Sequence, residues 1–277
     1  MASSVAAPTG VVAARERACY TRVAVQGLLF LAAAPALFLA GALATGMDIG
    51  AEGTFFGVAM VVALVAAAVE WRFRLPGRIT GIVVSLVMAG MLFWLAFGLF
   101  APTSFLEFTG ATLFVLGFVM ALAGSIAAIV QQRRGHVAAA ASGGELRIIR
   151  GALVVVAVAA LVSGVLSIAA RSTVDSAAAA GATTVDMSNF QFAPRAYEMP
   201  AGETTKLLIH NRDAFMHDFT ITALGVGPIS LGPGSQQLVE VNAPAGDYLI
   251  RCTLHSGSSE DPSEAQGDSM TALLTAR

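Results

Sequence analysis

Five long apolar stretches fill most of the first 170 residues, and none of them contains Asp, Glu, Lys, Arg or His. A helix needs about 20 apolar residues to cross roughly 30 Å of hydrocarbon. Four stretches reach that length, and the second reaches it by including Glu70 and Trp71. The sequence therefore predicts five membrane-spanning helices, at residues 23–44, 54–69, 79–100, 108–130 and 151–170.

Composition favours the same interpretation. Hydrophobic residues make up 56% of the chain and charged residues 12%, whereas about a quarter of the residues in soluble domains are charged. The first stretch has an alternative interpretation as a secretory signal, because Ala42-Leu43-Ala44 resembles a cleavage site. Its apolar core is longer than the roughly 7–15 residues of such signals, so we expect a helix.

Arginines predict the orientation of the five helices. Ten of the eleven arginines before residue 182 fall on one side of the predicted bundle, with Arg171 as the exception. Cytoplasmic loops carry such an excess of basic residues. We therefore expect a multi-pass protein of the cytoplasmic membrane, with a cytoplasmic N-terminus and an extracytoplasmic C-terminal part. Cys19 and Cys252 then lie on opposite sides and cannot form a disulfide.

The predicted helices carry few functional signals. No ionisable residue lies in the middle of a segment, which argues against a proton relay, and the absence of histidine argues against haem. Glu70 and Glu107 are interpreted as interfacial charges at segment ends. Gly110, Gly117 and Gly124 recur every seven residues, which predicts a face that a neighbouring helix approaches closely.

The chain changes character after the fifth stretch. Residues rich in Ser, Ala, Thr and Gly form a predicted linker, and short β-type runs broken by Pro and Gly follow it. Such spacing predicts an antiparallel sandwich or barrel. The expected parts are an N-terminal cytoplasmic segment at 1–22, a five-helix domain at 23–170, a linker at 171–182 and a β domain at 183–277. Expected strands are 183–187, 196–199, 204–211, 217–223, 236–242, 247–252 and 270–276.

Alternation within two strands places polar side chains among core residues. In HDFTIT, His217 shares a face with Phe219, and Asp218 lies on the opposite, solvated face. In YLIRC, Cys252 shares a face with Ile250. The sequence therefore predicts that His217 and Cys252 point into the sandwich.

The residue pattern of this β region resembles the cupredoxins, the blue-copper family. The matching motifs are the HDF that begins with His217, the YLIRCTLH that holds Cys252 and His255, and the final MTALLTA that begins with Met270. The resemblance implies an all-β Greek-key sandwich after the transmembrane helices, with one copper ion bound by these four residues. A thiolate, two imidazoles and a weak axial thioether accept both Cu(II) and Cu(I). The implied activity is one-electron transfer.

The sequence departs from the family pattern between the last two ligands. Fourteen residues, SGSSEDPSEAQGDS, separate His255 from Met270, whereas the family has only a few. Met270 remains the expected axial ligand because it begins the strand beside that of Cys252. Met216 and Met187 are the alternatives, and a site without an axial methionine is a further one.

Other chemistries fit the residues less well. Structural zinc usually takes four Cys or His ligands, and the β region has one Cys and three His, of which His210 has an expected structural or surface role. No nucleophile motif surrounds Cys252, and a multi-copper enzyme needs more histidines. We therefore expect an electron carrier or copper-binding protein rather than an enzyme. A copper-homeostasis protein and an accessory copper domain of a membrane transport or respiratory complex stay open.

Charge bears on the expected partners. Residues 183–277 hold eleven acidic and five basic residues, a net charge of −6, and the preceding part has a net charge of +4. Besides the lipid bilayer, the expected partner is a redox protein that docks near the copper end. We interpret the acidic stretch of the long loop as a solvated loop, and the alternative is a docking edge that steers a basic redox partner. We expect no nucleic acid and leave the oligomeric state open. The loop acids are Glu260, Asp261, Glu264 and Asp268.

The arginine content points to a bacterial source. The chain has fifteen arginines and a single lysine, together with abundant alanine, which is typical of proteins from GC-rich bacterial genomes.

Overall fold

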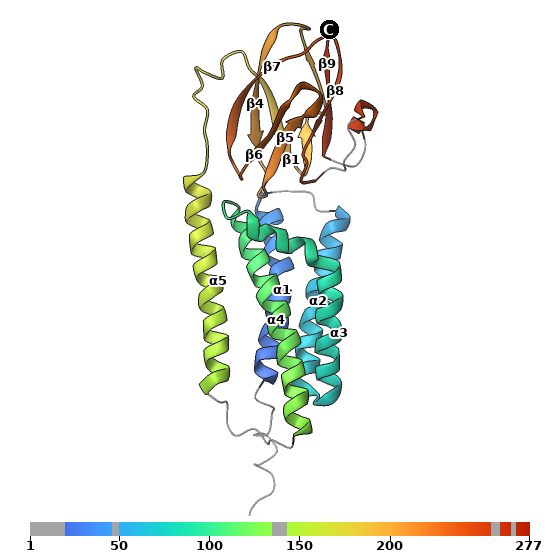
Figure 1. The fold of residues 1–277 in the computed structure, drawn as a ribbon, viewed down its shortest axis with the longest axis vertical. Coiled ribbons are helices and arrows are strands. Elements are labelled where there is room, and N and C mark those ends of the chain that lie inside the picture. The colour runs from blue at the N-terminus through green and yellow to red at the C-terminus, as the bar shows by residue number, and fades with distance from the viewer. Residues whose placement is uncertain (1–19, 46–49, 135–142, 256–260, 267–269) are drawn as a thin grey trace, which may run out of the picture. The chain divides into compact units, whose positions relative to one another are not determined.

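The computed structural model describes residues 20–45, 50–134, 143–255, 261–266 and 270–277 (Figure 1). Two compact units are present, one made of helix residues and one that contains all the described strands. Cys19, Glu260 and Asp268, which figure in the sequence-based expectations, lie outside the described residues.

Five helices confirm the expected number of apolar segments. Each is long and apolar enough to cross a membrane, as judged by length and composition over the described residues. Polar residues at the segment ends extend the helices beyond the apolar stretches, as at Glu70 and Arg72. The helices are α1 (Thr21–Thr45), α2 (Gly50–Arg72), α3 (Leu75–Leu92), which continues as a 3-10 helix (Phe93–Phe100), α4 (Phe105–Arg133) and α5 (Gly143–Ala169).

Two of the three regularly spaced glycines of α4 lie where α1 approaches closely. A Cβ atom added to Gly117 would stand 2.8 Å from the backbone nitrogen of Leu31, and one added to Gly124 would stand 2.6 Å from that of Ala24. Gly110 has nothing within 4 Å of such an atom among the described residues. The predicted close approach is therefore confirmed at Gly117 and Gly124 only.

Glu70, which was expected to be an interfacial charge at a segment end, is buried among the helices. Its side chain is 1% exposed and lies among α2, α3 and α4. A Cβ atom on Gly81 would stand 2.6 Å from Glu70 Oε2 and 2.7 Å from Ser125 Oγ. The missing side chain at Gly81 leaves the space that the carboxylate occupies.

Nine strands form two sheets that face each other (Figure 1). One sheet has the strand order β2-β1-β4-β7 and the other has β3-β9-β8-β5-β6. The chain crosses repeatedly from one sheet to the other, as Greek-key sandwiches do. The strands are β1 (Thr183–Ser188), β2 (Gln191–Ala193), β3 (Ala196–Met199), β4 (Thr204–Asn211), β5 (His217–Ile221), β6 (Val226–Leu231), β7 (Gln236–Asn242), β8 (Gly246–Arg251) and β9 (Thr271–Ala276).

The expectation of a purely antiparallel sandwich is wrong. Strand β1 pairs parallel to β4, and β3 pairs parallel to β9. Parallel neighbours need a long connection between them. Here that connection runs through the opposite sheet, because β3 belongs to the second sheet and lies between β1 and β4 in the sequence.

The sequence analysis did not predict strands β2 and β6, and both lie at the edge of a sheet. Strand β2 has only three residues, and β6 contains Gly227-Pro228, which reads as a turn. Proline lacks a backbone N–H and is therefore tolerated in a strand mainly at a sheet edge. The edge position of β6, which pairs only with β5 in its sheet, explains how Pro228 fits.

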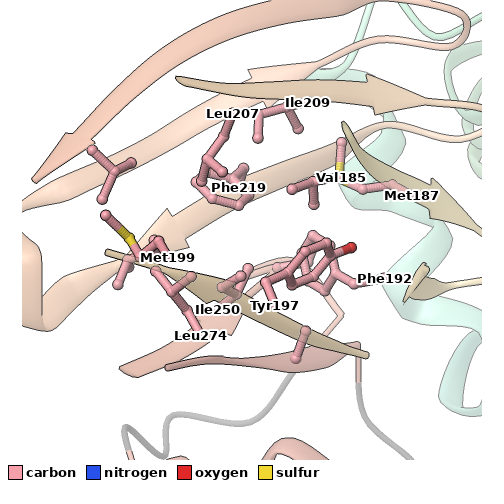
Figure 2. Packing of buried hydrophobic residues seen from close by; sticks show 14 of the residues in the cluster. Val185, Met187, Phe192, Tyr197, Met199, Leu207, Ile209, Phe219, Ile250 and Leu274 are labelled. Atoms are coloured by element: carbon pink, nitrogen blue, oxygen red, sulfur yellow. The ribbon is translucent and has the colours of Figure 1, made fainter. Parts of the chain in front are cut away.

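The core lies between the sheets and contains the inward-pointing residues of both (Figure 2). Phe219 and Ile250 of one sheet and Ile209 of the other belong to this core, and all three are completely buried. Burial of each such side chain stabilises the fold by about 1.5–3 kcal/mol. Cys252 belongs to this core, which confirms that it points inward.

We predict that Gly117→Ala destabilises the helical unit and that Gly110→Ala does not. The methyl group at position 117 must displace the α1 backbone, which costs about 1–3 kcal/mol in packed interiors. At position 110 the methyl group meets nothing within 4 Å, and replacing a helical glycine gains about 0.5–1 kcal/mol. Thermal unfolding of both variants in detergent measures the difference, and equal melting temperatures would contradict the α1–α4 contact.

Candidate metal centre

Three side chains with metal-binding atoms converge at one end of the β sandwich. His217 begins β5, Cys252 directly follows β8, and His255 lies in the turn after it. Strands β5 and β8 are neighbours, paired at Thr220 and Arg251. Adjacent strands therefore bring together residues that are far apart in the sequence, and one potential ligand atom from each lies within 4.8 Å of the others.

The three atoms form a compact triangle. His217 Nδ1 lies 3.1 Å from His255 Nδ1 and 3.9 Å from Cys252 Sγ, and His255 Nδ1 lies 3.4 Å from the same sulfur. A first-row metal ion bonds nitrogen and sulfur at roughly 2.0–2.3 Å, so three donors arranged around it stand roughly 3.5 Å apart. The triangle has the size that such an ion requires.

The three residues differ in how deeply they are buried. His217 and Cys252 are 0% exposed, and His255 is partly exposed. The site therefore has a buried thiol and imidazole, and one imidazole at the rim.

Cys252 is a protonated thiol in the metal-free protein at neutral pH. Burial raises its pKa to about 11, and the charge of Asp218 acts in the same direction. The backbone N–H of Asp218 partly opposes this effect by donating to Sγ at 3.4 Å. A metal ion must displace the thiol proton, so metal binding and proton release are coupled.

His255 is neutral and has a lone pair to donate. Burial, together with the neighbouring His217, lowers its pKa to about 4. An uncharged imidazole is the form that binds metals.

Asp213 orients His217. Its Oδ2 lies 2.8 Å from His217 Nε2. Burial alone would raise the pKa of Asp213, but hydrogen bonds from His217 and from two backbone N–H groups outweigh burial and lower it. The ionised carboxylate accepts a hydrogen bond from Nε2–H, which leaves the Nδ1 lone pair facing Cys252 and His255. Metal-binding histidines commonly have such a carboxylate partner on the other ring nitrogen.

Asn211 fixes the loop that holds Asp213. Its side-chain amide donates to the carbonyls of Phe215 and Leu231, at 2.8 and 2.9 Å, and its carbonyl oxygen accepts from Asp213 N at 2.9 Å. All three bonds are buried. The carboxylate is therefore held in place before any metal binds.

Asp218 is buried, not solvated as the alternation predicted. Its side chain is 2% exposed because it joins β5 to the turn after Cys252. Its carboxylate accepts from Thr253 N at 3.0 Å, from Thr253 Oγ1 at 2.6 Å and from Thr220 Oγ1 at 2.9 Å. These bonds tie the segment that carries Cys252 and His255 to the strand that carries His217.

Met270 lies beside Cys252 at the start of β9. Its carbonyl oxygen accepts a hydrogen bond from Cys252 N at 3.1 Å, and its side chain is 1% exposed within the core cluster. The backbone placement is the expected one, and the role of its sulfur as axial ligand stays a prediction. Of the alternatives, Met187 is completely buried on β1, and Met216 precedes His217.

Sequence reasoning missed the two aspartates that support the site. Asp218 was assigned to the wrong face because β5 is buried on both faces. The only sequence signal for Asp213 was its position four residues before His217. His210 has the expected structural role, with Nδ1 at 3.4 Å from Asp186 Oδ1.

A comparison with family models places a cupredoxin-like domain at residues 153–260. This range contains His217, Cys252 and His255 and ends before Met270. The match agrees with the resemblance drawn from the motifs. A comparison with curated proteins returned no match.

Solved structures similar to this chain include a nitrite reductase, an auracyanin and an amicyanin. A copper-containing nitrite reductase from Thermus scotoductus is 22% identical over 35% of this chain and 22% of its own length, with a TM-score of 0.26. Reduced auracyanin from Roseiflexus castenholzii is 17% identical, covering 35% of this chain and 99% of its own, with a TM-score of 0.25. A Cu(I) amicyanin variant is 22% identical, covering 38% and 86%, with a TM-score of 0.25. The chain thus spans about a fifth of the reductase.

We predict that Asp218→Ala destabilises the metal-free β unit. The substitution leaves the buried Thr220 hydroxyl without its acceptor and removes both hydrogen bonds to Thr253, and a buried unsatisfied group costs about 1–3 kcal/mol. Asp247→Ala is the matched control, since Asp247 also accepts from a threonine hydroxyl, at 2.7 Å, but on the surface. Thermal unfolding followed by circular dichroism compares the two, and similar losses in both would contradict the role of Asp218.

Proposed function

We propose that this chain, which carries a cupredoxin-like domain after five apolar helices, is a membrane-anchored mononuclear copper protein for one-electron transfer. The observation that carries the proposal is the triangle formed by His217 Nδ1, Cys252 Sγ and His255 Nδ1. In this proposal residues 183–277 form the copper-binding domain, 171–182 the linker, 23–170 the membrane anchor and 1–22 a cytoplasmic segment.

The donor set favours copper over zinc. Two imidazoles and one thiolate in a trigonal arrangement are the ligands of blue-copper sites, whereas structural zinc usually takes four strong ligands. The described part of the chain has only one group of three such residues. Copper bound there would supply a centre that gains and loses one electron. Met270 is the proposed fourth, axial ligand.

The hydrogen bonds around the site favour electron transfer over copper exchange. Asp213 holds His217, and Asp218 holds the turn of Cys252 and His255, so the ligands are positioned before metal binds. Fixed ligands limit rearrangement between oxidation states, which speeds electron transfer. A protein that hands copper on needs ligands that move apart. For this reason we place the homeostasis role second, and an accessory role in a membrane complex third, and propose no enzymatic reaction.

His255 is the proposed exit for the electron. It is the one partly exposed member of the triangle, and the neighbouring Leu254 is 51% exposed, which offers an apolar contact to a partner. Asp261, whose side chain is exposed, begins the described part of the acidic loop. A redox partner with a basic rim around an apolar contact fits this end of the domain.

Copper binding is tested on the full chain in detergent. We expect Cu(II) to produce the intense visible absorption of a copper–thiolate bond, with one copper per chain, and ascorbate to bleach it reversibly. Cys252→Ser removes the thiolate and abolishes the band. Cys19→Ser, which replaces the other cysteine of the chain, is the matched control and leaves the band unchanged.

Two results would contradict parts of the proposal. A wild-type protein without the band is not a blue-copper protein. Release of copper on each reduction, instead of reversible bleaching, would favour copper homeostasis over electron transfer.

The proposed orientation follows from the arginine distribution, and it is tested separately. An epitope tag after Arg277 is expected to be cleaved by protease added to intact spheroplasts, and a tag before Met1 is expected to be protected until the cells are lysed. The opposite pattern would reverse the topology and place the copper domain in the cytoplasm.

A further inference from the structure

The loop between β1 and β2 has an unusual backbone. Ser188 pairs with Gln191, so the hairpin turns on only two residues, Asn189 and Phe190. Both have positive φ angles, 56° and 55°. Two-residue turns of this kind favour Asn followed by Gly, because a bulky side chain fits this backbone conformation poorly. A phenylalanine at the second position is therefore an outlier that needs an explanation.

The carboxylate of Asp213 holds this turn in place. Asn189 N donates to Oδ1 at 2.7 Å, and Phe190 N donates to Oδ2 at 3.0 Å. The same Oδ2 lies 2.8 Å from His217 Nε2. One side chain that is only 5% exposed thus fixes the hairpin tip and orients a proposed copper ligand together.

The Phe190 ring packs against the two histidines of the triangle. Its centroid lies 5.3 Å from that of His217 and 4.9 Å from that of His255, with interplanar angles of 88° and 78°. Its other neighbour is Phe215, stacked at 5.4 Å and 30°. Phe190 is not part of the buried core cluster between the sheets. Its contacts are thus with the metal-binding end of the domain.

We propose that Phe190 is a positioning residue, which holds the His255 imidazole against His217 and shields it from water. Asp213 keeps the ring in place by binding the turn that presents it. Glycine would adopt the backbone conformation at position 190 more easily. The contacts of the aromatic ring therefore explain why a phenylalanine stands there. Structural strain retained at a binding site is often a sign of such a role.

This inference rests on the copper site proposed above, so its test has one readout without metal. In the metal-free full chain in detergent, the rate at which diethylpyrocarbonate modifies His255 is measured by mass spectrometry. His210, which lies outside the site, serves as the internal reference. We expect Phe190→Gly to raise the ratio of the His255 rate to the His210 rate severalfold. Phe190→Tyr, which keeps the ring, restores the wild-type ratio.

The second readout is the loss of copper to a chelator. Phe190→Gly is expected to speed it about tenfold, the scale of effects seen when groups that orient a metal-binding histidine are removed. Asn189→Gly is the matched control, because it also relaxes the turn but keeps the ring, and it is expected to match wild type in both readouts.

Each outcome decides the inference. If Phe190→Gly leaves the modification ratio unchanged, or if Asn189→Gly changes it as much, the ring does not position His255. If wild type binds no copper but Phe190→Gly still exposes His255, the copper function fails while the positioning role stands. Melting temperatures of all variants identify any that are unfolded.

Discussion

Two buried aspartates make it possible for this sandwich to hold a thiol and two imidazoles at the end of an apolar core. Burial of polar groups costs free energy unless they are hydrogen-bonded. The carboxylate of Asp213 accepts hydrogen bonds from His217 and from the hairpin tip. The carboxylate of Asp218 accepts from Thr253, and the backbone N–H of Asp218 donates to Cys252 Sγ. The carboxylate of Asp218 thereby joins β5 to the turn after β8 through two hydrogen bonds from Thr253.

Strand pairing brings the ligand residues close together, and the buried aspartates orient them for binding. Pairing of β5 with β8 brings His217 near Cys252, but it does not decide which ring nitrogen faces the sulfur. Asp213 decides this by accepting a hydrogen bond from Nε2–H. Metal binding then further requires the loss of the Cys252 proton, because burial raises the pKa of this thiol to about 11.

The helical unit and the β unit are stabilised by different interactions. The helices are held by close backbone approach at small residues, as at Gly117 and Gly124, since lipid offers no hydrophobic drive for their association. The β unit relies on apolar burial between its sheets, where Phe219 and Ile250 are completely covered. Glu70 shows that the helical unit also buries a carboxylate, where Gly81 leaves room for it.

The sequence by itself determined the five helices, because the length of an uncharged apolar run is a local property. It also determined most strands and the inward direction of His217 and Cys252, because alternation is local as well. Only the tertiary structure decided the parallel pairs β1–β4 and β3–β9, the edge strand that accommodates Pro228, and the roles of Asp213, Asp218 and Phe190. Each of these depends on contacts between segments distant in the chain, which neither period nor spacing encodes.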